Sequence, residues 1–75
     1  MQKEMSDKHE RLLTLFKVAI EREQESQQMY EKMLVDCEDA ALREVIERLR
    51  DSERMHEELL LERYKFLRAG DQFKD

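Results

Sequence analysis

Three side chains that can bind a metal ion interrupt two apolar helical stripes of this sequence. Glu23 lies at the centre of a stripe in the first half of the chain, and Glu53 and His56 lie at the centre of a similar stripe in the second half. Burying ionisable groups on packing faces is unfavourable unless a partner compensates their charge, most simply a cation. The pattern therefore predicts a metal site built from these three residues.

The spacing of the three residues predicts one shared level in a helical hairpin. If the chain turns at Cys37–Asp39, Glu23 lies 15 residues before Glu38 and Glu53 lies 15 residues after it. At ~1.5 Å per helical residue, both carboxylates are then roughly 22 Å from the turn. Glu53 and His56 are three residues apart and share a helical face, so both can reach one ion.

Two amphipathic helices are expected to position these residues. Apolar residues recur at helical spacing in both halves, and a chain with no Pro and one Gly lacks the turn residues of β-rich folds. The predicted fold class is all-α, an antiparallel two-helix hairpin that forms one domain over residues 1–75. We expect helix 1 over about 7–36, a turn over about 37–39, helix 2 over about 39–68 and a frayed tail over 70–75.

The predicted helix ends follow from capping residues. Ser6 or Asp7, with Glu10 completing a capping box, predicts the start of helix 1, and Gly70 predicts the end of helix 2. The join lacks Gly and Pro, and its only signal is a set of acidic residues that suit a new helix N-terminus: Asp36, Glu38 and Asp39. One continuous helix of about 60 residues in a coiled coil stays an alternative.

The small size of the chain predicts that it needs a stabilising partner. Seventy-five residues, of which 44% are charged, bury little core alone, and the single Cys37 cannot form an internal disulfide. One chain also offers only two carboxylates and one imidazole. A two-fold axis at their level would double this set inside a four-helix bundle, a site for two metals whose oxygen-rich ligands suit iron or manganese.

Charge and hydropathy exclude two classes of partner. The net charge of -5, with both signs interspersed, argues against a general nucleic-acid binder. No apolar run approaches the roughly 20 residues that span a bilayer, and Met1–Glu10 has no signal-peptide hydrophobic segment. The lone thiol fits a reducing compartment. We expect a cytoplasmic protein without a nucleic-acid or membrane partner.

The sequence resembles one half of a rubrerythrin or ferritin-like unit. The residues that carry the resemblance are the segment Ala19–Glu23, Tyr30, and the pair Glu53-x-x-His56. It is also similar to the encapsulated ferritins, whose two-helix chains pair to build an iron site between subunits. The resemblance implies that Glu23 is a terminal carboxylate ligand, Glu53 a bridging carboxylate and His56 a terminal nitrogen ligand. It implies that Tyr30 assists catalysis, by bonding a ligand carboxylate across the bundle or by donating an electron.

The resemblance implies a ferroxidase, a di-iron carboxylate protein that oxidises Fe(II) in a homodimer or a larger ring of dimers. Manganese or another divalent metal stays an alternative to iron. Peroxide reduction at the same site, and a metal-free structural coiled coil or adaptor, are alternative functions. The chain departs from the family in lacking a Cys-x-x-Cys rubredoxin-type centre, so it does not carry a full rubrerythrin electron-transfer path. An encapsulin-type shell is a further possible partner, but no Gly- and Leu-rich tail of the kind that encapsulin cargo carries follows Gly70, which argues against packaging in a shell.

Neighbouring residues have simpler interpretations. Glu25 and Glu57 are expected to lie on solvated faces of the helices. The alternative is that they line a path by which iron enters the site. Tyr30 at helical spacing is equally consistent with a core aromatic, and Cys37 with a small buried hydrophobe. Three methionines are expected to pack in the core: Met29, Met33 and Met55.

Overall fold

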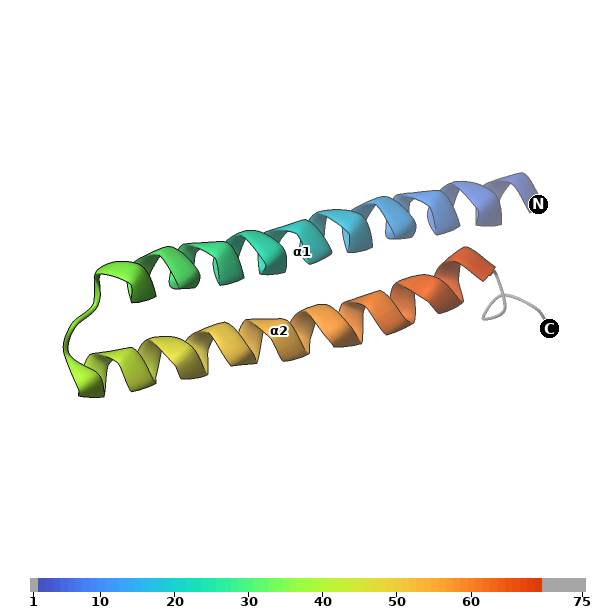
Figure 1. Cartoon of the computed structure of the whole chain (residues 1–75). Helices are drawn as coiled ribbons and strands as arrows, with labels where there is room; N and C mark the ends of the chain where they lie inside the picture. The colour runs from blue at the N-terminus through green and yellow to red at the C-terminus, as the bar shows by residue number, and fades with distance from the viewer. Residues whose placement is uncertain (1, 70–75) are drawn as a thin grey trace.

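The chain folds into a helical hairpin (Figure 1). The structure, a computed structural model, describes the backbone of residues 2–69 and the side chains of residues 7–69. Over these residues it contains two helices and no strand: α1 spans Gln2–Asp36 and α2 spans Ala40–Ala69. Figure 1 shows α2 running back alongside α1. The predicted all-α hairpin is confirmed, and the alternative of one continuous helix is wrong because the helix breaks after Asp36.

A side-chain cap makes the turn without Gly or Pro. The N–H of Leu42 donates to Asp39 Oδ2 at 2.9 Å, and the N–H of Arg43 donates to Asp39 O at 2.9 Å. The first bond satisfies an N–H group that the first turn of α2 leaves free, and the second is the first i to i−4 bond of the helix. The guanidinium of Arg43 donates to Leu34 O at 2.7 Å and to Cys37 O at 3.1 Å, at the carboxyl end of α1. Asp39 therefore caps α2, which begins at Ala40, and Arg43 links the start of α2 to the carboxyl end of α1.

The outer ends of the helices differ from the capping prediction. Helix α1 begins at Gln2, before the predicted start at Ser6 or Asp7. The residues ahead of Ser6 are good helix formers without Gly or Pro, so the helix continues through the predicted cap. Helix α2 reaches Ala69. The predicted cap residue Gly70 and the predicted frayed tail lie outside the described residues.

The core between the two helices is thin. Its buried hydrophobic side chains number two from each helix over the described residues: Ile20, Leu34, Ile46 and Leu67. The Cα atoms extend over 57 × 17 × 12 Å, so the hairpin is a single layer of helices. Large hydrophobic side chains stay exposed along both helices: Leu12, Leu15, Val18, Met29, Met33, Val35, Leu42, Val45, Leu49, Met55, Leu59 and Phe66. One hairpin therefore leaves much apolar surface without a partner.

Neither helix in the described part of the chain is long and apolar enough to cross a membrane.

Replacing Asp39 with Ala tests the cap. We expect the free energy of unfolding to fall by about 1 kcal/mol, because the variant loses the carboxylate that accepts the Leu42 N–H. The matched control is Asp36→Ala at the carboxyl end of α1, where an acidic side chain opposes the helix dipole, so this variant should be as stable as the wild type or slightly more. Urea unfolding followed by circular dichroism at one protein concentration measures both. Equal losses in the two variants would contradict the cap.

Candidate metal centre

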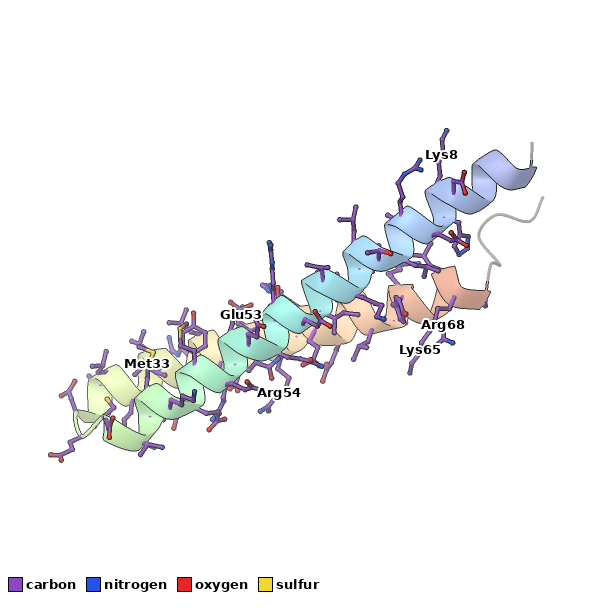
Figure 2. All side chains as sticks on the ribbon, turned by 90° about the horizontal axis from the view of Figure 1, so that it is seen from above. Lys8, Met33, Glu53, Arg54, Lys65 and Arg68 are labelled. Atoms are coloured by element: carbon purple, nitrogen blue, oxygen red, sulfur yellow. The ribbon has the colours of Figure 1, made fainter. Side chains whose placement is uncertain are left out.

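Glu23, Glu53 and His56 lie together in the middle of the hairpin. Glu23 comes from α1 and the other two from α2, and one donor atom of each lies within 4.8 Å of the others. Figure 2 shows Glu53 about midway along the hairpin. Antiparallel packing thus brings together the three residues whose spacing predicts a shared level.

The imidazole of His56 lies beside both carboxylates. Its Nδ1 is 3.6 Å from Glu23 Oε1 and 3.5 Å from Glu53 Oε1. These distances allow ion pairs when the imidazole is protonated, but they exceed the length of an ordinary N–H···O hydrogen bond. The three donor atoms therefore converge without bonding firmly to one another.

The Oε1 atom of Glu23 is buried and has no hydrogen-bond partner among the described residues. The pKa of Glu23 is raised, first because Glu53 can share a hydrogen bond with its protonated form, then by burial and by repulsion from the Glu53 charge. The neighbouring His56 side chain lowers the pKa of Glu23, but by less than these effects raise it. When both carboxyls are ionised, no proton links them and the oxygen is unpartnered. A divalent cation fits this donor set, because it would partner the oxygen and offset the repulsion.

The cluster is open on one side. The exposed fraction is 22% for the Glu23 side chain and 24% for Glu53, but 55% for His56. The imidazole therefore stands at the open edge. Three protein donors are fewer than the roughly four to six ligands that a transition metal takes. The remaining ligands have to reach the cluster from its open side.

Glu57 lies at the level of the cluster but does not belong to it. Its carboxylate accepts hydrogen bonds from Gln24 Nε2 at 2.8 Å and from Gln27 Nε2 at 2.7 Å. Gln24 first, and then Gln27, lower the pKa of Glu57 by stabilising its ionised form. The expectation of a solvated face was wrong for Glu57, since the side chain is half-buried and bonded to α1. Arg43, Arg50 and Glu57 recur every seven residues and all bond to α1, and this spacing is the weak sequence signal for the role of Glu57.

The other candidate residues lie outside the cluster. Tyr30 is half-buried on α1, about two helical turns nearer the hairpin turn than Glu23. A hydrogen bond from Tyr30 across a bundle needs a second copy and stays a prediction. Glu25 is exposed, and Cys37 is half-buried at the turn, where its Sγ lies 3.6 Å from Asp39 O. The methionines predicted to pack are exposed in the hairpin, because they lie away from the contact between the two helices: Met29, Met33 and Met55.

Comparison with protein-family models, curated proteins and solved structures finds no match to this chain. The fold and the cluster together define a helical hairpin with a candidate metal-binding site.

Glu23→Gln tests the charge repulsion within the metal-free site. The variant should be more stable than the wild type at neutral pH, because it removes an unpartnered charge beside Glu53. The raised pKa means that the folded protein holds the Glu23 proton more tightly than the unfolded chain does. The wild type therefore gains stability relative to the variant as the pH falls through the folded pKa, and this gain is complete below the unfolded pKa.

Urea unfolding in a chelator, repeated from neutral pH into the acid range, measures this difference. The matched control is Glu25→Gln, which changes an exposed carboxylate on the same helix and should show no such gain. A Glu23→Gln variant less stable than the wild type at neutral pH would show that the two carboxylates do not oppose each other.

Proposed function

We propose that this chain oxidises Fe(II) at Glu23, Glu53 and His56, in a dimer that joins two such clusters. The observation that carries the proposal is the buried, unpartnered oxygen of Glu23 beside a second carboxylate and an imidazole. Carboxylate oxygens and imidazole nitrogen are suitable donors for iron, and manganese accepts the same donors. Iron is the substrate of the proposed reaction.

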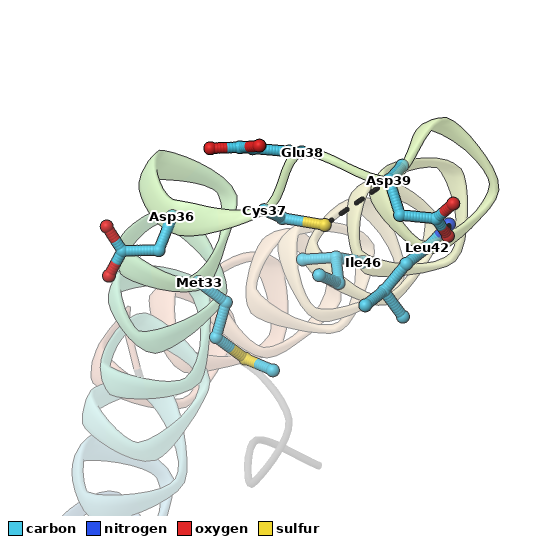
Figure 3. A pocket seen from close by; sticks show the side chains of 7 residues that line it. All are labelled: Met33, Asp36, Cys37, Glu38, Asp39, Leu42 and Ile46. Carbon is cyan, nitrogen blue, oxygen red and sulfur yellow. Dashed lines mark hydrogen bonds between the residues drawn. The ribbon is translucent and has the colours of Figure 1, made fainter.

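Two apolar hollows lie on either side of the cluster along the hairpin. The one near the turn has an apolar part formed by Met33, Leu42 and Ile46, and the other residues that line it belong to the turn region (Figure 3): Asp36, Cys37, Glu38 and Asp39. The other lies toward the open end and is lined by residues of both helices: Leu12, Leu15, Phe16, Ala19 and Leu60. Apolar surface of this kind favours association with a partner that removes it from water. A partner covering both hollows would also cover the cluster between them.

The exposed stripe of α2 includes a metal-binding candidate. Val45, Leu49, His56 and Leu59 recur at helical spacing and therefore share one side of the helix. Each is exposed in the hairpin, with Val45 at 50% and Leu49 at 43%. The imidazole thus lies in the same stripe as the side chains that most favour burial.

A second copy of the chain is the partner that completes this site. A two-fold axis at the level of the cluster would pack the same face of two hairpins together as a four-helix bundle. It would supply four carboxylates and two imidazoles from Glu23, Glu53 and His56 of both copies, enough for two ions that share bridging carboxylates. In the proposed dimer Tyr30 lies beside the site. A larger ring would be assembled from such dimers.

The proposed reaction balances with two irons and one molecule of oxygen. Each Fe(II) loses one electron and becomes Fe(III), and the two electrons with two protons convert O₂ to hydrogen peroxide. Anionic oxygen ligands stabilise the higher charge of Fe(III), so the carboxylates favour the loss of the electron. Hydrogen peroxide would be an alternative oxidant, taking two electrons and two protons to form two waters.

An anaerobic titration with Fe(II), with the mass of the assembly measured in parallel, tests this function. We expect saturation at about one iron per chain and a dimer that tightens as metal is added, because the metal binds only the assembled form. Glu53→Ala and His56→Ala should lose this binding. Glu58→Ala, an exposed change on the same helix, is the matched control and should keep it. Admitting oxygen should then consume about one O₂ for every two irons.

Assembly without saturable metal binding would contradict the proposal and favour the metal-free coiled coil. Continued consumption of hydrogen peroxide with an external reductant, in place of a single burst of iron oxidation, would favour peroxide reduction at the same residues.

A further inference from the structure

A polar bridge joins the two helices at the level of Glu23, Glu53 and His56. Glu57 on α2 uses both carboxylate oxygens: Oε2 accepts from Gln24 Nε2 at 2.8 Å, and Oε1 accepts from Gln27 Nε2 at 2.7 Å. Hydrogen bonds to an ionised carboxylate are stronger than those between neutral groups. These three residues, which we call the clamp, therefore hold one point of α2 against two points of α1.

The clamp contacts the backbone that carries the metal-binding side chains. Gln27 Nε2 also donates to the carbonyl oxygen of Glu23 at 3.3 Å. Gln24 directly follows Glu23, and Glu57 directly follows His56. Gln27 also lies four residues after Glu23, and Glu57 lies four residues after Glu53, so each is one helical turn from a ligand carboxylate and shares its side of the helix. A shift of the helices that lengthened these bonds would also change the separation of Glu23 from His56.

The clamp is one of three bridges along a single seam of the hairpin. Arg43, Arg50 and Glu57 recur every seven residues on α2, and each bonds to α1. The middle bridge is the contact of Arg50 with Glu31 at 3.0 Å. It lies about two helical turns from Glu57 on α2 and about one turn from Gln27 on α1. Neither Arg50 nor Glu31 adjoins a ligand in the sequence, so this bridge serves as an internal control for one that only stabilises the hairpin.

We infer that Gln24, Gln27 and Glu57 are positioning residues that set the distance between Glu23 and the α2 ligands before a metal ion binds. This inference rests on the proposed function. Repulsion between Glu23 and Glu53 favours separation of the helices at this level when no cation is present. The clamp opposes that separation within one helical turn of both carboxylates. The metal then meets donor atoms already close together, and less ordering is required when it binds.

Titration of the full chain with Co(II) tests the clamp, because the visible absorption spectrum of Co(II) reports the number and arrangement of its ligands. Glu57→Ala should weaken Co(II) binding by about 10- to 100-fold, the usual effect of losing a group that orients metal ligands, and should alter the spectrum. The matched control Glu31→Ala should keep the wild-type affinity and spectrum. Urea unfolding of both metal-free variants shows how much stability each bridge contributes.

A second set of variants separates positioning from a general loss of structure. Gln24→Ala combined with Gln27→Ala should weaken Co(II) binding as much as Glu57→Ala does. Adding Glu57→Ala to that pair should cause little further loss, since all three residues act as one unit. Glu57→Gln keeps one acceptor oxygen and should recover part of the affinity.

The outcomes distinguish the clamp from the site itself. A wild-type chain that binds no Co(II) would overturn the metal site and the clamp with it. A wild-type chain that binds Co(II), with Glu57→Ala equal to Glu31→Ala in affinity and spectrum, would overturn the clamp alone and leave the proposed function intact.

Discussion

Two carboxylates, Glu23 and Glu53, approach each other across the helix pair with one imidazole beside them and one oxygen without a partner. In the metal-free hairpin this arrangement is unfavourable, because like charges at close range raise each other's energy and burial weakens the screening by water. The capped turn and the cross-helix bonds of Arg43, Arg50 and Glu57 hold the helices together despite it. The hairpin thus maintains an unfavourable cluster that a cation would relieve.

The same constraint connects the site to the thin core. A single hairpin buries few side chains and leaves apolar hollows toward the turn and toward the open end, with the polar cluster between them. A second copy would cover the hollows and double the donor set in one step. Within this account, burial of the apolar face drives association, and metal binding favours the assembled form over the separate hairpins.

Helical geometry explains how much of this arrangement the sequence could predict. The rise of a helix is nearly constant, so equal distances of Glu23 and Glu53 from the turn were enough to place them at one level. The bridge made by Glu57 depends on how each helix is rotated about its axis, which single-chain spacing only weakly indicates. The exposure of Met29 and Met55 has the same cause, since an apolar stripe does not say which part of it contacts the partner helix. The start of α1 was misplaced because helix propensity ahead of Ser6 outweighed a local cap.

The spacing of residues in one chain does not determine which metal binds, because iron and manganese accept the same donors. It also does not describe the contacts that a second copy of the chain would make.

The central claim is that two copies of this hairpin share one site for two metal ions. The most direct measurement is a crystal structure grown with Mn(II), with each ion located by its anomalous scattering. The account predicts two ions between two hairpins, bound by Glu23, Glu53 and His56 of both copies. Ions held by one copy alone, or bound away from these residues, would contradict it.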